Sequence, residues 1–179
     1  LVFARRSRLA PALAALMGGV ALFVSNLNWL DPQITPLVPV LKSYWLMIHV
    51  SVVTASYGFF GICAACGIAS LAATAFGRNL RELRAINEMA MIVGLALLTA
   101  GIFFGAVWAN ESWGRYWGWD PKETWALITM FAYALATHSR HIPRLDGPFA
   151  FDVLSVVCFS TVLMTFFGVN YSLSGLHSY

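Results

Sequence analysis

The sequence predicts an all-α membrane protein, a polytopic helical bundle with about five transmembrane helices. Three observations predict this class. Of the 179 residues, 59% are hydrophobic and only 11% are charged, whereas soluble domains have roughly 25% charged residues. The mean hydropathy is +0.72. Five apolar stretches reach or approach the length of about 20 residues that a helix needs to cross the hydrocarbon core.

The five predicted spans follow one another along the chain with short loops between them. They run over Leu9–Leu30, Tyr44–Phe76, Asn87–Trp108, Pro121–His138 and Pro148–Val169. The second stretch is longer than one upright crossing requires, so we expect it to tilt or to project from the membrane. Because the chain begins with Leu1 and not with Met, we expect the native start to lie upstream.

The composition also excludes other classes of protein. The net charge of +3 comes from scattered residues, which argues against a nucleic-acid-binding module. Three cysteines are too few for a disulfide scaffold, and so apolar a chain is not expected to be disordered.

The arginines predict the orientation of the bundle. If the spans alternate, eight of the eleven Lys and Arg residues lie on one side: Arg5, Arg6, Arg8, Arg78, Arg81, Arg84, Arg140 and Arg144. The positive-inside rule makes that side cytoplasmic. Residues 25–43, residues 109–120 and the tail from residue 170 then share the opposite, outer face.

The outer loop between the third and fourth spans concentrates aromatic residues. Five of the seven tryptophans lie within residues 108–125. Gly114 and Gly118 let the backbone turn and a flat ligand approach, and the aromatic residues between them offer stacking surface. These aromatic residues are Trp113, Tyr116, Trp117 and Trp119. The pattern indicates either a ligand platform or an aromatic belt at the membrane interface.

The end of this loop has a simpler interpretation. Asp120, Pro121 and Glu123 occupy the N-cap, N1 and N3 positions of the fourth span. This pattern predicts a reciprocal capping box that starts the helix.

Two of the four histidines lie on the same predicted face as the loop. His49 lies near the outer end of the second span, and His177 lies beyond the fifth. Paired neutral imidazoles can hold iron from opposite sides, and a broad apolar macrocycle between them would rest against Trp and Tyr rings. The outer cations Arg115, Lys122 and Lys42 would meet its anionic substituents or remain solvated loop charges. The pattern therefore predicts a haem site.

The remaining histidines and a cysteine pair carry weaker signals. His138 closes the fourth span, where an ionisable residue is either functional or snorkels to the interface. The spacing to His141 would suit a chelated metal, but no neighbouring residue completes the shell.

Cys63 and Cys66 have the spacing of a redox or haem-attachment pair, but Gly67 follows where attachment needs His, so we interpret them as packing residues.

These motifs together resemble a known family. The stretch Trp113-Gly-Arg-Tyr-Trp117-Gly-Trp119-Asp120-Pro-Lys-Glu123 is similar to the tryptophan-rich WWD signature of haem-handling cytochrome c assembly proteins. Within them it is most similar to the CcsA (ResC) branch of the System II cytochrome c synthase. The segments around His49 and His177 resemble those that carry the two outer-face haem ligands of the family. His138 resembles its membrane-embedded haem-binding histidine.

The resemblance implies that the chain is part of a holocytochrome c synthase, a haem lyase. It would bind b-type haem as a substrate through the iron ligands His49, His177 and His138, and present it to the Cys-x-x-Cys-His motif of apocytochrome c. His49 and His177 would be the catalytic residues and would act mainly by positioning. The other haem-binding residues would be Trp113, Gly114, Arg115, Tyr116, Trp117, Trp119 and Asp120.

The resemblance also implies a domain division, a partner and a location. Residues 1–40 would form the first span and an outer loop, and residues 41–179 the haem-handling domain. The expected partner is a CcsB (ResB)-like membrane protein, separate or fused, and the second inner histidine would come from this partner or from missing sequence. The membrane would be the bacterial inner membrane or the plastid thylakoid membrane.

Two alternatives remain open at this stage. One is a non-catalytic bis-His haem protein, which would be an exporter, a chaperone or an electron-transfer cytochrome. The other is a membrane scaffold whose tryptophans form only a belt.

Overall fold

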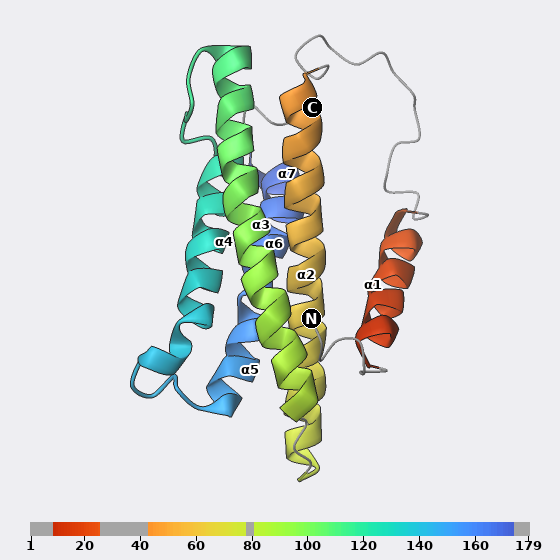
Figure 1. Ribbon diagram of the computed structural model, residues 1–179. Coiled ribbons are helices and arrows are strands. Elements are labelled where there is room, and N and C mark those ends of the chain that lie inside the picture. Colours follow the sequence, from red (N-terminus) through yellow and green to blue (C-terminus); the bar gives the residue numbers. More distant parts are fainter. Residues whose placement is uncertain (1–8, 26–42, 78–80, 174–179) are drawn as a thin grey trace.

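The computed structural model describes residues 9–25, 43–77 and 81–173, and these residues form helices and connecting turns without any strand (Figure 1). The helices are α1 (Leu9–Ser25), α2 (Tyr44–Ala75), α3 (Arg81–Trp113), α4 (Pro121–Thr137), α5 (Pro148–Val157), α6 (Phe159–Leu163) and α7 (Val169–Ser172). A 3₁₀ turn at Ser139–His141 follows α4, and a π-helix at Met164–Gly168 joins α6 to α7. The predicted all-α class is confirmed.

Three stretches of the described residues are long and apolar enough to cross a membrane. They are α2, α3 and the continuous stretch from α5 to α7, Pro148–Ser172. Since α2 and α3 have 32 and 33 residues, each measures about 50 Å and extends beyond a hydrocarbon core of about 30 Å. Helices α1 and α4 have 17 residues each, which is the lower limit for a span.

The helix ends differ from the predicted spans at several places. Helix α3 begins at Arg81 and ends at Trp113, beyond the predicted Asn87–Trp108 at both ends. Hydropathy marks only the apolar part of a helix, whereas backbone hydrogen bonds carry the helix on through polar residues. The last part of the predicted first span and the predicted domain boundary at residue 40 lie outside the described residues.

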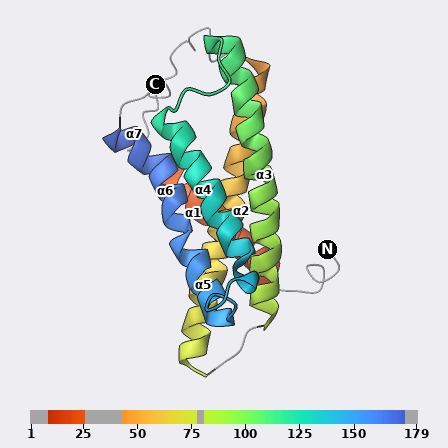
Figure 2. The same cartoon turned by 90° about the vertical axis from the view of Figure 1, so that its left-hand side faces the viewer.

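The core of the bundle lies between α2, α3, α4 and the last helical stretch. Helices α2 and α3 run side by side in opposite directions, and α1 stands apart beside α2 (Figures 1 and 2). The Phe60 ring stacks on the Tyr133 ring with centroids 3.6 Å apart, and both side chains are fully buried. Cys63, Cys66 and Cys158 are free thiols, all buried, as expected of packing residues.

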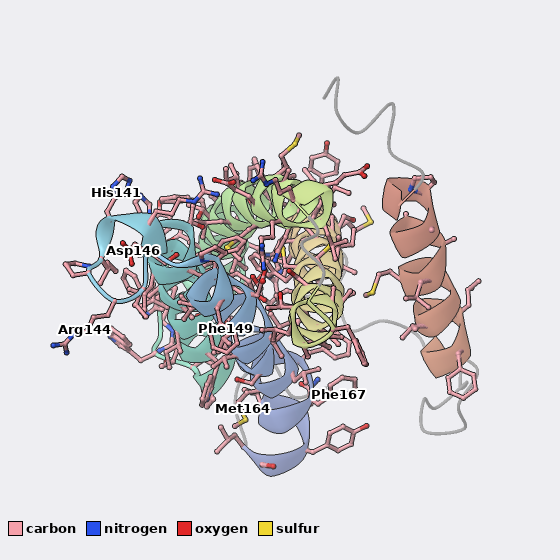
Figure 3. The ribbon with its side chains drawn as sticks, turned by 90° about the horizontal axis from the view of Figure 1, so that it is seen from below. His141, Arg144, Asp146, Phe149, Met164 and Phe167 are labelled. Carbon is pink, nitrogen blue, oxygen red and sulfur yellow. The ribbon has the colours of Figure 1, made fainter. Side chains whose placement is uncertain are left out.

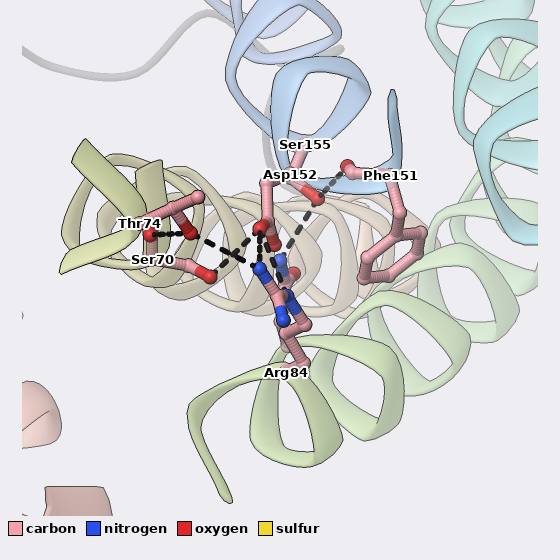
Figure 4. Close-up of polar contacts among 7 residues, drawn as sticks. Ser70, Thr74, Arg84, Phe151, Asp152 and Ser155 are labelled. Atoms are coloured by element: carbon pink, nitrogen blue, oxygen red, sulfur yellow. Dashed lines mark hydrogen bonds and ion pairs between the residues drawn. The ribbon is translucent and has the colours of Figure 1, made fainter. Parts of the chain in front are cut away.

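A buried polar cluster joins α2, α3 and α5 (Figure 4), at the end of the bundle opposite the connection between α3 and α4 (Figure 1). Asp152, which has no exposed surface, accepts hydrogen bonds from Arg84 Nε at 2.9 Å and from Ser70 Oγ at 2.7 Å. Beside this ion pair, Asn87 Nδ2 donates to Ser155 Oγ at 2.9 Å. The cluster ties three helices together where the apolar core ends.

Candidate functional site

A pocket of about 330 Å³ lies at the end of the bundle that carries residues 113–120, which we call the tryptophan-rich loop. We call this end the loop end. The walls come from α2, α3, α4, the last helical stretch and the loop itself. Its polar and aromatic lining includes His49, Tyr57, Tyr116, Trp117, Lys122 and Glu123. The structure thus brings His49, from α2, together with two aromatic residues of the loop.

The His49 ring is held in a notch on α3. Its Nδ1 lies 2.7 Å from the carbonyl oxygen of Gly101. Because a carbonyl only accepts, Nδ1 carries the proton, and in the neutral ring Nε2 is the nitrogen with the lone pair. A Cβ added to Gly105 would lie only 2.7 Å from both Cε1 and Nδ1 of the ring. A ring nitrogen bonded to a backbone carbonyl is an arrangement typical of metal-ligating histidines.

The backbone of the tryptophan-rich loop turns through two left-handed residues. Gly114, at φ +70°, ends α3 and donates its N–H to Asn110 O at 2.9 Å. Trp119 has φ +56° and is 71% exposed. The Trp117 and Trp119 rings meet edge to face at 5.8 Å. Trp117 lines the pocket, and its buried Nε1 has no hydrogen-bond partner among the described residues.

The predicted capping box at the start of α4 is confirmed. Asp120 Oδ1 accepts from Lys122 N at 3.0 Å, and Glu123 Oε2 accepts from Asp120 N at 3.2 Å. The same Glu123 oxygen also accepts from Gly118 N at 2.8 Å, a bond that the sequence did not predict. Lys122 Nζ donates to Asn170 Oδ1 at 2.7 Å and so joins α4 to α7.

Other predicted site residues do not line the pocket. Trp113 packs edge to face on the buried Trp108 at 4.7 Å. The guanidinium of Arg115 lies against Gly118, where an added Cβ would be 3.0 Å from Arg115 Cζ. Lys122 is therefore the predicted outer cation that the described structure places in the pocket wall. Gly114, Trp119 and Asp120 shape the loop behind that wall.

The two remaining predicted ligands are not in this pocket. His138 caps the other end of α4, is exposed, and places its Nδ1 2.8 Å from Ala134 O. The neighbouring His141 is exposed at the same end, as is Arg144 (Figure 3). His177 lies outside the described residues. Within the described ranges, no group of three or more His, Cys, Asp or Glu side chains forms a metal centre.

Several pocket residues carried no functional prediction from the sequence. Tyr57, Thr165 and Asn170 lie in apolar helices or just after one, and only the packing brings them to the pocket. The notch on α3 could have been predicted from the sequence. Gly101 and Gly105 are four residues apart on one helix face, as in the small-residue packing motifs of membrane helices. That signal indicates a close neighbour but does not identify it as His49.

Comparisons with known proteins find a matching family model and several relatives. The family model described as "Cytochrome C assembly protein" matches residues 3–177. The chain is 50% identical to Protein NrfI of Wolinella succinogenes, with all of this chain and 21% of that protein aligned. It is 39% identical to the cytochrome c biogenesis protein CcsA of Chlamydomonas reinhardtii, with 82% of this chain and 44% of the relative aligned. It is 33% identical to CcsA of Prochlorococcus marinus strain NATL1A, with 97% of this chain and 66% of the relative aligned. The chain thus covers less than two thirds of each of these relatives.

Proposed function

The chain belongs to the cytochrome c assembly protein family, and on this basis we propose that it binds haem at the loop end and presents it to apocytochrome c. The observation that carries the proposal is the orientation of His49. Its Nδ1–H is committed to Gly101 O, and the ring forms part of the pocket wall beside Tyr116 and Trp117. Iron would be bound through Nε2.

The other pocket residues fit the chemistry of a haem. The macrocycle is flat and apolar, and the aliphatic and aromatic lining from α2, α3 and the last helical stretch suits its faces. Its carboxylates need donors, and two lie in the wall. Lys122 supplies an ammonium group, and Trp117 supplies a buried N–H that has no partner among the described residues.

The proposed mechanism uses this chain for positioning. His49 would hold the iron from one side, and His177 is proposed for the other side. The tryptophan-rich loop would fix the edge of the macrocycle, so that the vinyl groups face the incoming apocytochrome. Each cysteine S–H of the apocytochrome then adds across one vinyl C=C and forms one C–S and one C–H bond, with no net transfer of electrons. Holding both reactants in a near-attack geometry would supply most of the acceleration.

Further features of the proposal concern the assembly. His138, at the opposite end, is proposed as a second haem-binding position on the way to the loop end. A CcsB-like membrane protein is proposed as the partner that completes that position. The location proposed is an integral one in the bacterial inner membrane or the plastid thylakoid membrane, with the loop end facing the periplasm or lumen.

The test is co-expression of the full-length membrane protein with an apocytochrome c. We expect His49→Ala to lower covalent haem staining of the cytochrome about tenfold or more, with partial rescue by added imidazole. His141→Ala is the matched control, because this exposed histidine lies at the opposite end and should leave staining unchanged. Unchanged staining and haem spectra in His49→Ala would contradict the proposal. Tight haem binding by the native protein without any covalent product would instead identify a haem carrier.

A further inference from the structure

The Glu123 carboxylate does more than cap α4. A capping box needs one bond, from the N3 side chain back to the N-cap N–H, and Glu123 Oε2 makes it with Asp120 N at 3.2 Å. The second and shorter bond, 2.8 Å from Gly118 N, reaches two residues further back into the tryptophan-rich loop. One side chain thus fixes two loop amides at a single oxygen atom.

The residue between those two amides is Trp119, whose backbone is left-handed at φ +56°. Bulky L-residues rarely adopt this conformation, so the surroundings must hold it. Successive N–H groups around such a turn form a concave nest that binds an anion. The Glu123 carboxylate occupies this nest and so compensates the unfavourable backbone conformation of Trp119.

The same bonds connect the exposed side of the loop to the pocket. Gly118 directly follows Trp117, which lines the pocket and touches the Trp119 ring edge to face at 5.8 Å. Glu123 is itself part of the pocket wall. A change in the Gly118–Asp120 backbone would therefore move both indoles, one in the wall and one at the surface.

We propose that Glu123 is a positioning residue for haem, and that it acts by holding the Gly118–Asp120 nest so that Trp117 and Trp119 keep their places. Its role is mainly geometric: the first requirement is an accepting oxygen that reaches both amides, and the negative charge of the carboxylate adds less. This inference rests on the proposed haem-binding function. It assigns to Glu123 a task beyond starting a helix.

The experiment uses the full-length protein in detergent. It compares substitutions that separate the length of the side chain at position 123 from its charge. Glu123→Gln keeps an oxygen at the same reach without the charge, whereas Glu123→Asp keeps the charge but is one methylene too short. Glu111→Ala is the control, because Glu111 is an exposed acidic residue of α3 near the loop. Haem b is titrated and its Soret band recorded, and hydrogen–deuterium exchange reports the amides of residues 114–120.

The expected result is that Glu123→Gln and Glu111→Ala bind haem within about threefold of the native affinity and keep slow amide exchange. Glu123→Asp should lose about tenfold or more in affinity, shift the Soret band and exchange the Gly118 and Asp120 amides faster. Normal binding by Glu123→Asp with loss in Glu123→Gln would overturn the inference, because charge would then be the requirement. Normal binding by both variants would overturn it as well. If the native protein bound no haem, the proposed function would fail and this inference with it. If the native protein bound haem but the variants did not differ from one another as expected, only the inference would be refuted.

Discussion

At the scale of single residues, the site depends on side chains that are absent as much as on those that are present. His49 can approach α3 closely enough to bond Gly101 O only because Gly105, one turn away, has no Cβ. Glycine at position 105 costs helix stability, about 1 kcal/mol relative to alanine. In return, the His49 imidazole can adopt the orientation in which it bonds Gly101 O.

Gly105→Ala should therefore impair haem binding without unfolding the protein. The added methyl would come within 2.7 Å of His49 Cε1 and Nδ1, so the ring must turn and its bond to Gly101 must lengthen or break. We expect haem affinity to fall about tenfold, as for the loss of other second-shell contacts of a metal ligand. Gly58→Ala is the control, since an added Cβ there meets nothing within 4 Å. Equal haem affinities of the two variants in a Soret titration would contradict the role of the notch.

At the scale of helices, the α2–α3–α5 polar cluster explains how an apolar helix accommodates a carboxylate. Gly67 lets α2 approach α5 so closely that an added Cβ would lie 2.8 Å from Asp152 O. This proximity brings Ser70 within 2.7 Å of the Asp152 carboxylate, and Arg84 completes the ion pair from α3 at 2.8 Å. Each partner lowers the free-energy cost of burying the charge.

Asp152→Ala should destabilise the bundle much more than removal of an exposed ion pair. It leaves Arg84, whose side chain is only 18% exposed, without its carboxylate partner. We expect the free energy of unfolding in detergent to fall by about 3 kcal/mol. Glu88→Ala removes the Glu88–Arg140 pair, whose side chains are 38% and 60% exposed, and should cost less than about 1 kcal/mol. Similar losses in the two variants would show that the cluster is not what joins these helices.

Local sequence chemistry predicted some elements well and others not at all. The capping box of Asp120 and Glu123 was predictable because every residue in it lies within four positions. The π-helix at Met164–Gly168 was not, because no proline or charged residue in that part of the last span marks a change of helix type. Its Thr165 Oγ1 lies 3.1 Å from Thr129 Oγ1 of α4, a contact between residues 36 positions apart. Periodicity within one helix contains no information about such a pairing.

At the scale of the whole molecule, the site is a product of packing. The predicted topology placed His49 and the tryptophan-rich loop on one face, and the structure puts both at one pocket. The sequence could not separate the loop residues that line this pocket, Tyr116 and Trp117, from those that shape the loop behind it. That distinction depends on the left-handed turn at Trp119 and on the Glu123 bonds, which are contacts across the loop.

The distribution of cations over the bundle predicts which end faces the cytoplasm. Four of the six described Lys and Arg residues lie at the end opposite the loop: Arg81, Arg84, Arg140 and Arg144. The positive-inside rule predicts that this end lies in the cytoplasm or stroma and that the loop end lies outside. The loop end would then face the compartment into which an apocytochrome is delivered.

Cysteine labelling of intact cells tests this orientation. We expect a membrane-impermeant maleimide to label Glu111→Cys, near the loop, in intact cells, and to label Arg144→Cys only after permeabilisation. The native protein is a suitable background, because its three thiols are buried and should react slowly. The unsubstituted protein controls for residual reaction at those thiols. Labelling in the reverse order would place the His49 pocket in the cytoplasm, and haem presentation at the outer face would then have to be abandoned even if His49 binds haem.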